Sequence, residues 1–259
     1  MIISEEAMKK ISVIIITKNE EENIKECLDS VSWADEIILV DDESNDNTVK
    51  IASEYPNVKI FIKKMKGFGE QKNYALSKAS NEWVLSIDAD ERVTEELKNE
   101  IIEEINKGNF DGYLLRRKNF IFGEAWLEDR PTTLRVFKRL KGRFSESFVH
   151  ERVILDGSVG ELKNPLLHYS RALNKVENYI TTCLNHYTTK TAMDFEKKGV
   201  KINKFNIVYY FLIKPILIFF YKYIICKYFS KGVIGLILAQ FVAIAYLISY
   251  IKLWERQNK

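Results

Sequence analysis

Carboxylates follow two short apolar runs of this 259-residue chain. The first run lies in EWVLSIDADERV (82–93) and is followed by Asp88 and Asp90. The second lies in EIILVDDESNDNT (36–48) and is followed by Asp41 and Asp42. Because side chains alternate in direction along a strand, Asp-x-Asp places both carboxylates on one side. Such a pair suits a hard divalent cation, Mg²⁺ or Mn²⁺, whose other ligands come from water and phosphate. The first chemistry indicated is therefore a metal bound together with a diphosphate.

The elements that must position these acids are short and β-branched. Strands are expected over 11–16, 36–40, 58–62 and 82–88, with a basic strand over 134–139. Helices are expected in 19–33, with acids in the first turn, and from the N-cap Thr94 to Gly108, whereas the GFG at 67–69 is expected to be a flexible loop. The order β-α-β-α-β-β-α predicts an α/β layered domain with its ligand at the carboxyl ends of the strands.

From about residue 172 the pattern becomes helical, apolar and aromatic. The stretch 233–251 has 19 residues without a formal charge, close to the roughly 20 that span a bilayer. The stretch 205–229 is interrupted by lysines and Pro215, which favours a pair of interfacial amphipathic helices. We therefore divide the chain into domains 1–171 and 172–259, the second serving membrane association, a span or helical packing, including packing on another subunit.

Composition limits the class of protein. The net charge of +3 gives no global attraction to nucleic acid. The three cysteines are far apart and lack metal-ligand spacing, which is typical of reduced thiols in the cytoplasm. The first ten residues do not resemble a secretory signal. These features predict a cytoplasmic protein, peripheral on the inner face of the cell membrane.

Three separated stretches, 11–31, 36–48 and 67–93, resemble the family 2 inverting glycosyltransferases, which have the GT-A fold. The resemblance implies a Rossmann-like, nucleotide-sugar-binding domain that uses a UDP-sugar and Mg²⁺ or Mn²⁺. It places Thr17, Asn19 and Glu20 at the nucleotide, Asp42 or Asp41 at the uracil, Lys72 and Asn73 near the donor, and Asp88 and Asp90 at the ribose and metal. His168 is a further possible metal ligand, or simply a structural histidine.

A narrower resemblance rests on LRVFKR (134–139), FVHERV (148–153), HYS (168–170) and KGVIGL (231–236). These pieces are similar to lipopolysaccharide-core β-glucosyltransferases and to capsule or cell-wall relatives. They imply transfer of a hexose, expected to be glucose, to a glycan acceptor that is lipid-linked.

Inversion at a sugar carbon needs a base for the acceptor hydroxyl. We favour Glu151 in FVHERV, with Asp129 in LEDRP as the alternative; a surface role for Glu151 stays open. Arg130, Arg135 and Lys138 are candidates for contacting the diphosphate or an anionic acceptor. Two other functions remain open, a nucleotidyltransferase and a non-catalytic membrane-associated scaffold that binds a nucleotide sugar.

Overall fold

The computed structural model describes residues 8–127, 131–145 and 152–258, and these group into two compact units. The first unit comprises the described residues up to Asn119 and from Ala125 to Ser170, with most of the strands; the second comprises Phe120–Glu124 and the residues from Arg171 onward.

The main sheet of the first unit has seven strands in the described residues, in the order β12-β6-β9-β4-β1-β2-β3. Their bounds are β1 Ile11–Thr17, β2 Glu36–Asp41, β3 Val58–Ile62, β4 Trp83–Asp88, β6 Gly112–Leu115, β9 Thr133–Lys138 and β12 Val159–Glu161. Strands β3, β2, β1 and β4 are mutually parallel, whereas β9 runs antiparallel between β4 and β6. The five predicted strands are confirmed, in a mixed sheet.

Smaller strands complete the unit. A second sheet has the order β5-β13-β7-β8, with β5 Glu91–Arg92, β13 Leu166–His168, β7 Arg117–Ile121 and β8 Glu124–Leu127. Strands β10 (Gly142–Phe144) and β11 (Val153–Leu155) form an antiparallel pair.

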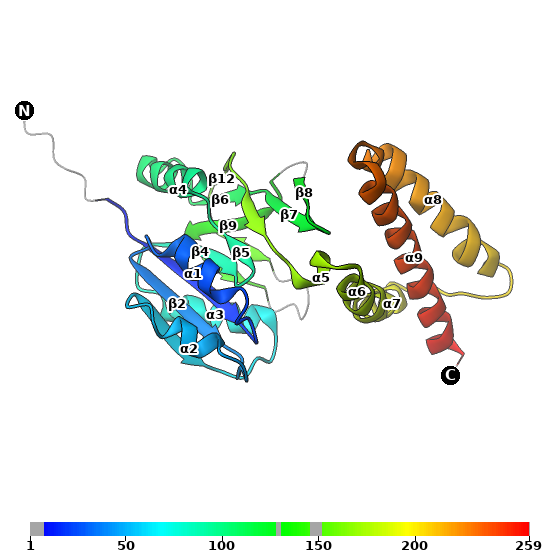
Figure 1. Cartoon of the computed structure of the whole chain (residues 1–259), viewed down its shortest axis with the longest axis horizontal. Helices are drawn as coiled ribbons and strands as arrows, with labels where there is room; N and C mark the ends of the chain where they lie inside the picture. Colours follow the sequence, from blue (N-terminus) through cyan, green and yellow to red (C-terminus); the bar gives the residue numbers. More distant parts are fainter. Residues whose placement is uncertain (1–7, 128–130, 146–151, 259) are drawn as a thin grey trace, which may run out of the picture. The chain divides into compact units, whose positions relative to one another are not determined.

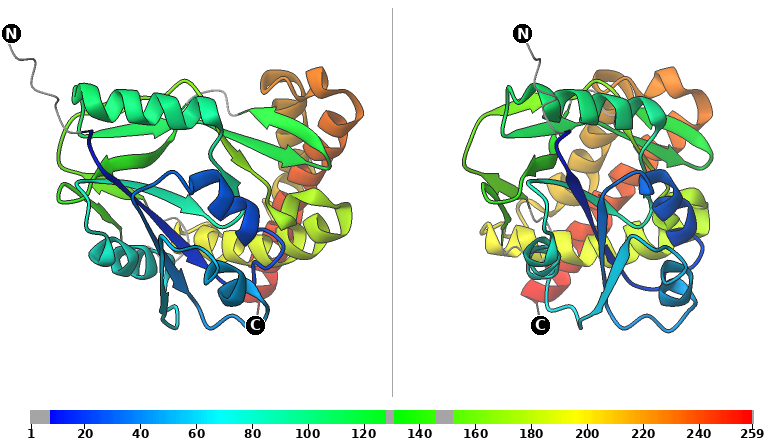
Figure 2. Two further views of the ribbon diagram at one scale, coloured as in Figure 1. Left: turned by 60° about the vertical axis from the view of Figure 1, so that its left-hand side comes forward. Right: turned by 90° about the vertical axis from the view of Figure 1, so that its left-hand side faces the viewer.

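Helices cover both faces of the main sheet (Figures 1 and 2). On one face, α1 (Ile24–Val31), α2 (Thr48–Ala52) and α4 (Glu95–Lys107) pack their apolar sides on alternate residues of β1, β2 and β4. On the other face, α3 (Phe68–Lys78) packs through Ala75 and Leu76 on Ile14, Ile38 and Val84. Successive side chains of β1 thus point to opposite faces of the sheet and pack in two separate cores, so the sheet is buried on both sides.

Helix α4 matches its prediction, the helix predicted within 19–33 is confirmed with a later start, and the loop predicted at 67–69 is wrong. Thr94 Oγ1 accepts a bond from Leu97 N at 3.2 Å, and Gly108 closes α4 at φ +68°. Helix α1 begins at Ile24, so Glu20, Glu21 and Glu22 precede it, because the chain turns at Asn19 (φ +53°). The expected loop at 67–69 is instead the start of α3, with Gly67 at the N-cap.

The second unit is helical, as predicted. It contains α5 (Arg171–Asn174), α6 (Val176–Tyr179), α7 (Thr188–Lys197), α8 (Lys214–Phe220) and α9 (Gly232–Gln257). Wider π-helical turns, η1 (Ile180–Tyr187), η2 (Tyr209–Ile213) and η3 (Tyr221–Ile225), and the 3₁₀ turn η4 (Tyr228–Lys231) join them. Its core lies around Ala192, Ile202, Tyr250 and Leu253. Within the described residues, the helix Tyr228–Gln257 is long and apolar enough to cross a membrane, by length and composition.

One buried acid holds the amino-terminal edge of the sheet together. Glu36 of β2 accepts bonds from Ser12 Oγ (2.6 Å), Lys59 Nζ (2.7 Å) and Ser80 N (2.8 Å). Burial opposes ionisation of this carboxyl, but these bonds outweigh it and lower the pKa of Glu36 to about 2. Three strands and the start of β4 therefore depend on a charged Glu36.

Because the pKa of Glu36 is lower in the folded chain, its contribution is present above the unfolded value, roughly 4.3, and is lost as the pH falls towards 2. We expect about 3 kcal/mol of unfolding free energy to disappear over that range. Urea unfolding of Glu36→Gln should show a flatter pH dependence than the parent chain. The exposed Glu161→Gln serves as the control, and equal slopes for the two variants would contradict the assignment.

Candidate active site

Three neighbouring strands end together at the carboxyl edge of the main sheet. Thr17 of β1 is paired with Asp41 of β2, and Ile16 of β1 with Asp88 of β4. The predicted meeting of acids at one edge is therefore confirmed, with β1 lying between the two acidic strand ends. At about 4.8 Å per strand spacing, Asp41 and Asp88 begin about 10 Å apart, so the two acidic pairs serve different parts of a ligand.

The turn after β1 is tied to the turn after β2. Asn19 N donates to Ser44 Oγ at 2.8 Å, and Asn19 Oδ1 accepts from Asn45 N at 2.9 Å. Glu20 N donates to Thr48 Oγ1 at 2.8 Å. Asn19 and Glu20 therefore shape the predicted nucleotide pocket through their backbone and side chains. Thr17 ends β1 beside them, and its buried Oγ1 has no hydrogen-bond partner among the described residues.

Asp41 and Asp42 have different surroundings. Asp41 is fully buried, and both of its oxygens accept bonds from Ser44, so it builds the turn. Asp42 accepts from Met65 N at 2.7 Å and pairs with the half-exposed Lys18 at 2.8 Å. Burial opposes charge on Asp42, but these bonds outweigh it and lower its pKa. Of the two residues predicted at the uracil, Asp42 has the partner that a ligand could replace, because Lys18 is half-exposed whereas Ser44 is part of the turn that Asp41 builds.

Asp88 is held by two cations. Lys72 of α3 lies 2.9 Å from Asp88 Oδ1, and Arg135 of β9 lies 3.1 Å from Oδ2. Lys72 and Arg135 are both buried. Burial works against the charged carboxylate, whereas Lys72 and Arg135 outweigh it and keep the pKa of Asp88 well below its usual range. Lys72 thus lies beside an acid of the predicted donor site.

Glu91 is bonded to the backbone of Asp88 and is fully buried. Its Oε2 accepts the backbone N–H of Asp88 at 2.8 Å, and its Oε1 accepts from Arg135 at 2.8 Å. Burial raises the pKa of Glu91 despite the charge of Arg135. Arg135, considered from the sequence as a contact for the diphosphate, therefore forms ion pairs with Asp88 and Glu91 and holds both carboxylates in place.

Asp90 faces His168, which comes from β13. His168 Nε2 lies 3.4 Å from Asp90 Oδ2, and His168 Nδ1 lies 2.7 Å from Asn119 Oδ1. Strand β13 pairs with β5, and Tyr169 N donates to Asp90 O at 2.8 Å. These contacts fix the position of His168 relative to Asp90. Burial disfavours protonated His168, but Asp90 and Glu91 outweigh it and raise the pKa of His168.

These two side chains fit a divalent cation. With Nδ1 donating to Asn119, Nε2 directs its proton at Asp90, and loss of that proton would leave the Nε2 lone pair available to a metal. The residues that the structure describes contain no cluster of three or more His, Cys, Asp and Glu suited to a metal. An ion held by Asp90 and His168 would need its other ligands from water and diphosphate, the ligands that Mg²⁺ and Mn²⁺ prefer.

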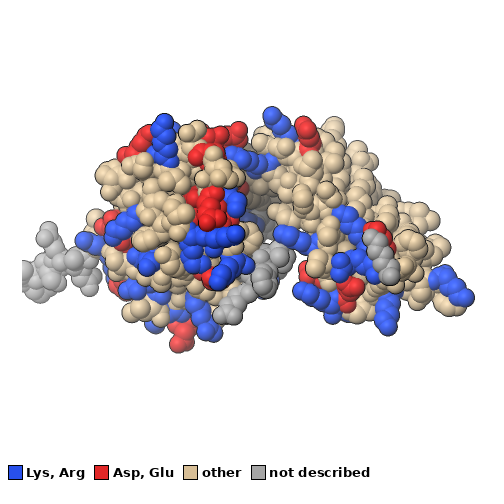
Figure 3. Space-filling view, turned by 90° about the horizontal axis from the view of Figure 1, so that it is seen from below, with Lys and Arg blue, Asp and Glu red and all other residues tan. Residues whose placement is uncertain are grey.

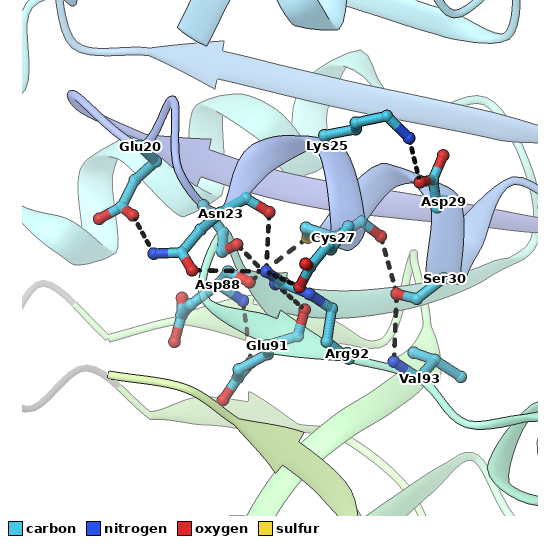
Figure 4. A network of polar contacts seen from close by, with 12 residues as sticks. Glu20, Asn23, Lys25, Cys27, Asp29, Ser30, Asp88, Glu91, Arg92 and Val93 are labelled. Carbon is cyan, nitrogen blue, oxygen red and sulfur yellow. Dashed lines mark hydrogen bonds and ion pairs between the residues drawn. The ribbon is translucent and has the colours of Figure 1, made fainter. Parts of the chain in front are cut away.

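Arg92 was not predicted, and it holds the turn between Asp88 and Glu91 (Figure 4). This buried guanidinium donates to Ala89 O (3.0 Å), Glu91 O (2.9 Å) and Asn23 O (2.8 Å), joining the turn to the start of α1. Its carbon Cζ lies 5.7 Å from the centre of the Tyr169 ring. The sequence signal that could have identified Arg92 is an arginine directly after an acidic strand end. Arg92 positions the turn that carries Asp90.

Asn73, predicted near the donor, bonds the backbone of Phe144. Its amide donates to Phe144 O at 2.9 Å and accepts from Phe144 N at 2.8 Å, which fastens β10 to α3. Just beyond β10, Ser145 N donates to Arg152 O at 2.9 Å. The predicted base Glu151 and its alternative Asp129 lie outside the described residues, as does Arg130, while Lys138 pairs with Asp111 at 2.9 Å.

The fold is that of the GT-A nucleotide-sugar transferases. The structure of S. aureus TarS 1–349 in complex with UDP-GlcNAc superposes with a TM-score of 0.51 at 18% identity, covering 96% of this chain and 92% of that one. At this identity the likeness concerns the fold, and it agrees with the GT-A prediction.

The model of Glycosyl transferase family 2 matches residues 12–156, and the chain belongs to that family. It is 31% identical to an uncharacterized glycosyltransferase of Rickettsia felis, over 96% of this chain and 90% of the relative. It is 27% identical to the lipopolysaccharide core biosynthesis glycosyltransferase LpsC of Rhizobium meliloti, over 95% of this chain and 92% of the relative. The family resemblance seen in the sequence is thereby confirmed.

Proposed function

We propose that this glycosyltransferase moves a hexose, expected to be glucose, from a UDP-sugar to a lipid-linked glycan of the lipopolysaccharide core, capsule or another envelope polysaccharide, with inversion. The observation that carries the proposal is the pairing of Asp90 with His168 next to Asp88, on the edge where Asp42 also lies. UDP-GlcNAc bound to TarS and the LpsC name support the donor and the pathway class.

Each residue has a proposed part in this reaction. Asp42 binds the uracil, Thr17, Asn19 and Glu20 line the nucleotide, and Asp88 holds the ribose. Asp90 and His168 hold Mg²⁺ or Mn²⁺, which when bound supplies Lewis-acid stabilisation to the leaving diphosphate. Lys72 adds a fixed positive charge next to Asp88, where negative charge grows during transfer. The contacts of Asn73 favour a supporting position behind the donor.

The base is proposed to be Glu151, with Asp129 as the alternative, and substitution separates them. Glu151→Gln and Asp129→Asn are compared for turnover and for UDP binding. The base is the residue whose replacement stops turnover while UDP binding persists. Normal turnover by Glu151→Gln would transfer the role to Asp129.

A donor panel tests the proposed function. The purified protein is incubated with UDP- and GDP-sugars and Mg²⁺ or Mn²⁺, with and without lipid-linked acceptor, and release of nucleoside diphosphate is measured. Release from one UDP-sugar, stimulated by acceptor and abolished by EDTA, is expected. Release of pyrophosphate from a nucleoside triphosphate would favour a nucleotidyltransferase, and binding without any release would favour a scaffold.

A further inference from the structure

The second unit carries a long segment with charge of one sign. Between Glu196 and Glu255 the sequence has no acidic residue, and its charges are Lys197, Lys198, Lys201, Lys204, Lys214, Lys222, Lys227, Lys231 and Lys252. Figure 3 shows broad areas of this unit's surface that bear no charged side chain. Apolar surface with cations at its margins is the composition of a segment that lies on an anionic membrane.

The apolar side chains of this segment form one stripe along the helical run η2-α8-η3. Exposed residues recur in pairs every four positions: Val208 and Tyr209, Leu212 and Ile213, Ile216 and Leu217, Phe220 and Tyr221, Ile224 and Ile225. In a regular α-helix a four-residue repeat drifts round the axis by about 40° each time. The wider π-helical turns η2 and η3 reduce this drift, so the stripe keeps to one face.

The side chains of this stripe are well exposed, and a contiguous exposed apolar surface marks an interaction site. Leu217 is 55% exposed and Ile225 67% exposed, and Phe205, at the start of the run, is 87% exposed. Lys214, on the same run, lies instead with its Nζ 5.3 Å from the Tyr210 ring and 5.6 Å from the Tyr250 ring, inside the unit. The run therefore separates an outer apolar face from an inner, polar and aromatic one.

The contacts of α9 favour a surface position over a membrane span. Near its carboxyl end, Lys252 Nζ donates to Asn185 O (2.7 Å), Thr188 Oγ1 (2.9 Å) and Thr189 Oγ1 (2.8 Å). Arg256 pairs with Glu196 at 2.6 Å. Within the apolar part of α9, the Phe195 ring of α7 lies 5.0 Å from the Tyr250 ring and 6.2 Å from the Tyr246 ring. Helix α7 is thus fastened along α9, and its charged side chains would enter the hydrocarbon if α9 crossed it.

Charge disfavours a second copy of the chain as the occupant of the stripe. A two-fold interface sets the same patch against itself, and here it would bring lysine against lysine. Lipid phosphates complement that charge. We propose that the stripe of η2-α8-η3 lies in the headgroup boundary of an anionic phospholipid bilayer, parallel to its surface, with Lys204 and Lys227 contacting lipid phosphates.

This docking deepens the proposed function, because it brings the enzyme to a lipid-linked acceptor, but it is tested without donor or acceptor. The full chain is floated with vesicles of phosphatidylcholine alone or with about one third phosphatidylglycerol. Binding to the anionic vesicles, weakened by salt, is expected. Failure of transfer would leave this result untouched, and failure to bind would leave soluble donor chemistry intact.

Three variants sharpen the experiment. Leu217→Glu/Ile225→Glu should reduce vesicle binding at least tenfold, and Lys204→Gln/Lys227→Gln should remove most of the preference for anionic lipid. Ile62→Glu, at an equally exposed apolar residue of the first unit (57%), is the matched control and should bind normally. Circular dichroism verifies that each variant is folded, and the exposure of the sites makes that the expected result.

Three results would overturn the proposal. One is equal vesicle binding by Leu217→Glu/Ile225→Glu and the parent chain. Another is a dimer in sedimentation that this double variant dissociates, with no binding to vesicles. The third is resistance of the bound protein to alkaline carbonate, which would replace the in-plane position with a span.

Discussion

Asp90→Asn is expected to lower metal-dependent transfer by about 10³-fold or more, because a metal at a leaving diphosphate contributes several kcal/mol to the transition state. The amide keeps the shape of the side chain but loses the charge that faces His168. The backbone bond from Tyr169 N to Asp90 O does not depend on that charge, so the fold should be retained.

The measurement is UDP release as Mn²⁺ is titrated, together with calorimetric titration of Mn²⁺ in the presence of UDP. Asp156→Asn, at an exposed acid of the same unit, is the control and should match the parent chain. Asp90→Asn should lose Mn²⁺ affinity in both assays. Unchanged turnover would remove Asp90 from the metal site.

Arg135→Met is expected to lower the free energy of unfolding by about 3–5 kcal/mol, the usual cost of breaking a buried ion pair by removing one partner. Arg135 is the cation that bonds both Asp88 and the fully buried Glu91. Without it, Glu91 keeps its bond from the N–H of Asp88, at 2.8 Å, in surroundings where burial already raises the pKa of Glu91.

A double substitution separates charge from packing. Glu91→Gln/Arg135→Met removes the stranded carboxylate and should recover more than half of the lost stability in urea unfolding. Arg139→Met, on the same segment and bonded to Asn81 O at 3.0 Å, is the matched control and should cost about 1 kcal/mol. If the double variant were less stable than Arg135→Met, the loss would come from packing.

The sequence predicted the parts of this chain whose signals are local. Strands β1, β2 and β4 are apolar runs that end in a polar residue, and Thr94 and Gly108 bracket α4 as caps. Helix α3 was missed because its apolar residues follow the helical period only weakly and a glycine-containing GFG opens it. Its buried side chains include Gln71 and Lys72, which no apolar period would mark.

Contacts between segments that are distant in the sequence could not be predicted from it. His168 lies 78 positions from Asp90 in sequence, and only the pairing of β13 with β5 brings them together. The roles of Arg92 and Arg135 likewise depend on where α1 and β9 lie. Asp41 and Asp42 are adjacent and chemically alike, so their different tasks emerged only from the bonds of Ser44, Lys18 and Met65.

The placement of β1 between the two acidic strand ends bears on ligand length. A molecule that reaches both Asp42 and the Asp88–Asp90 corner must bridge about two strand spacings, roughly 10 Å. Inorganic pyrophosphate and a simple sugar phosphate are too short to touch both ends at once. A nucleoside diphosphate, with its base at one end and phosphates at the other, has that length. With the proposed roles of Asp42, Asp88 and Asp90, the strand order would favour a nucleoside diphosphate over shorter phosphates by length, independently of the hydroxyls of the sugar.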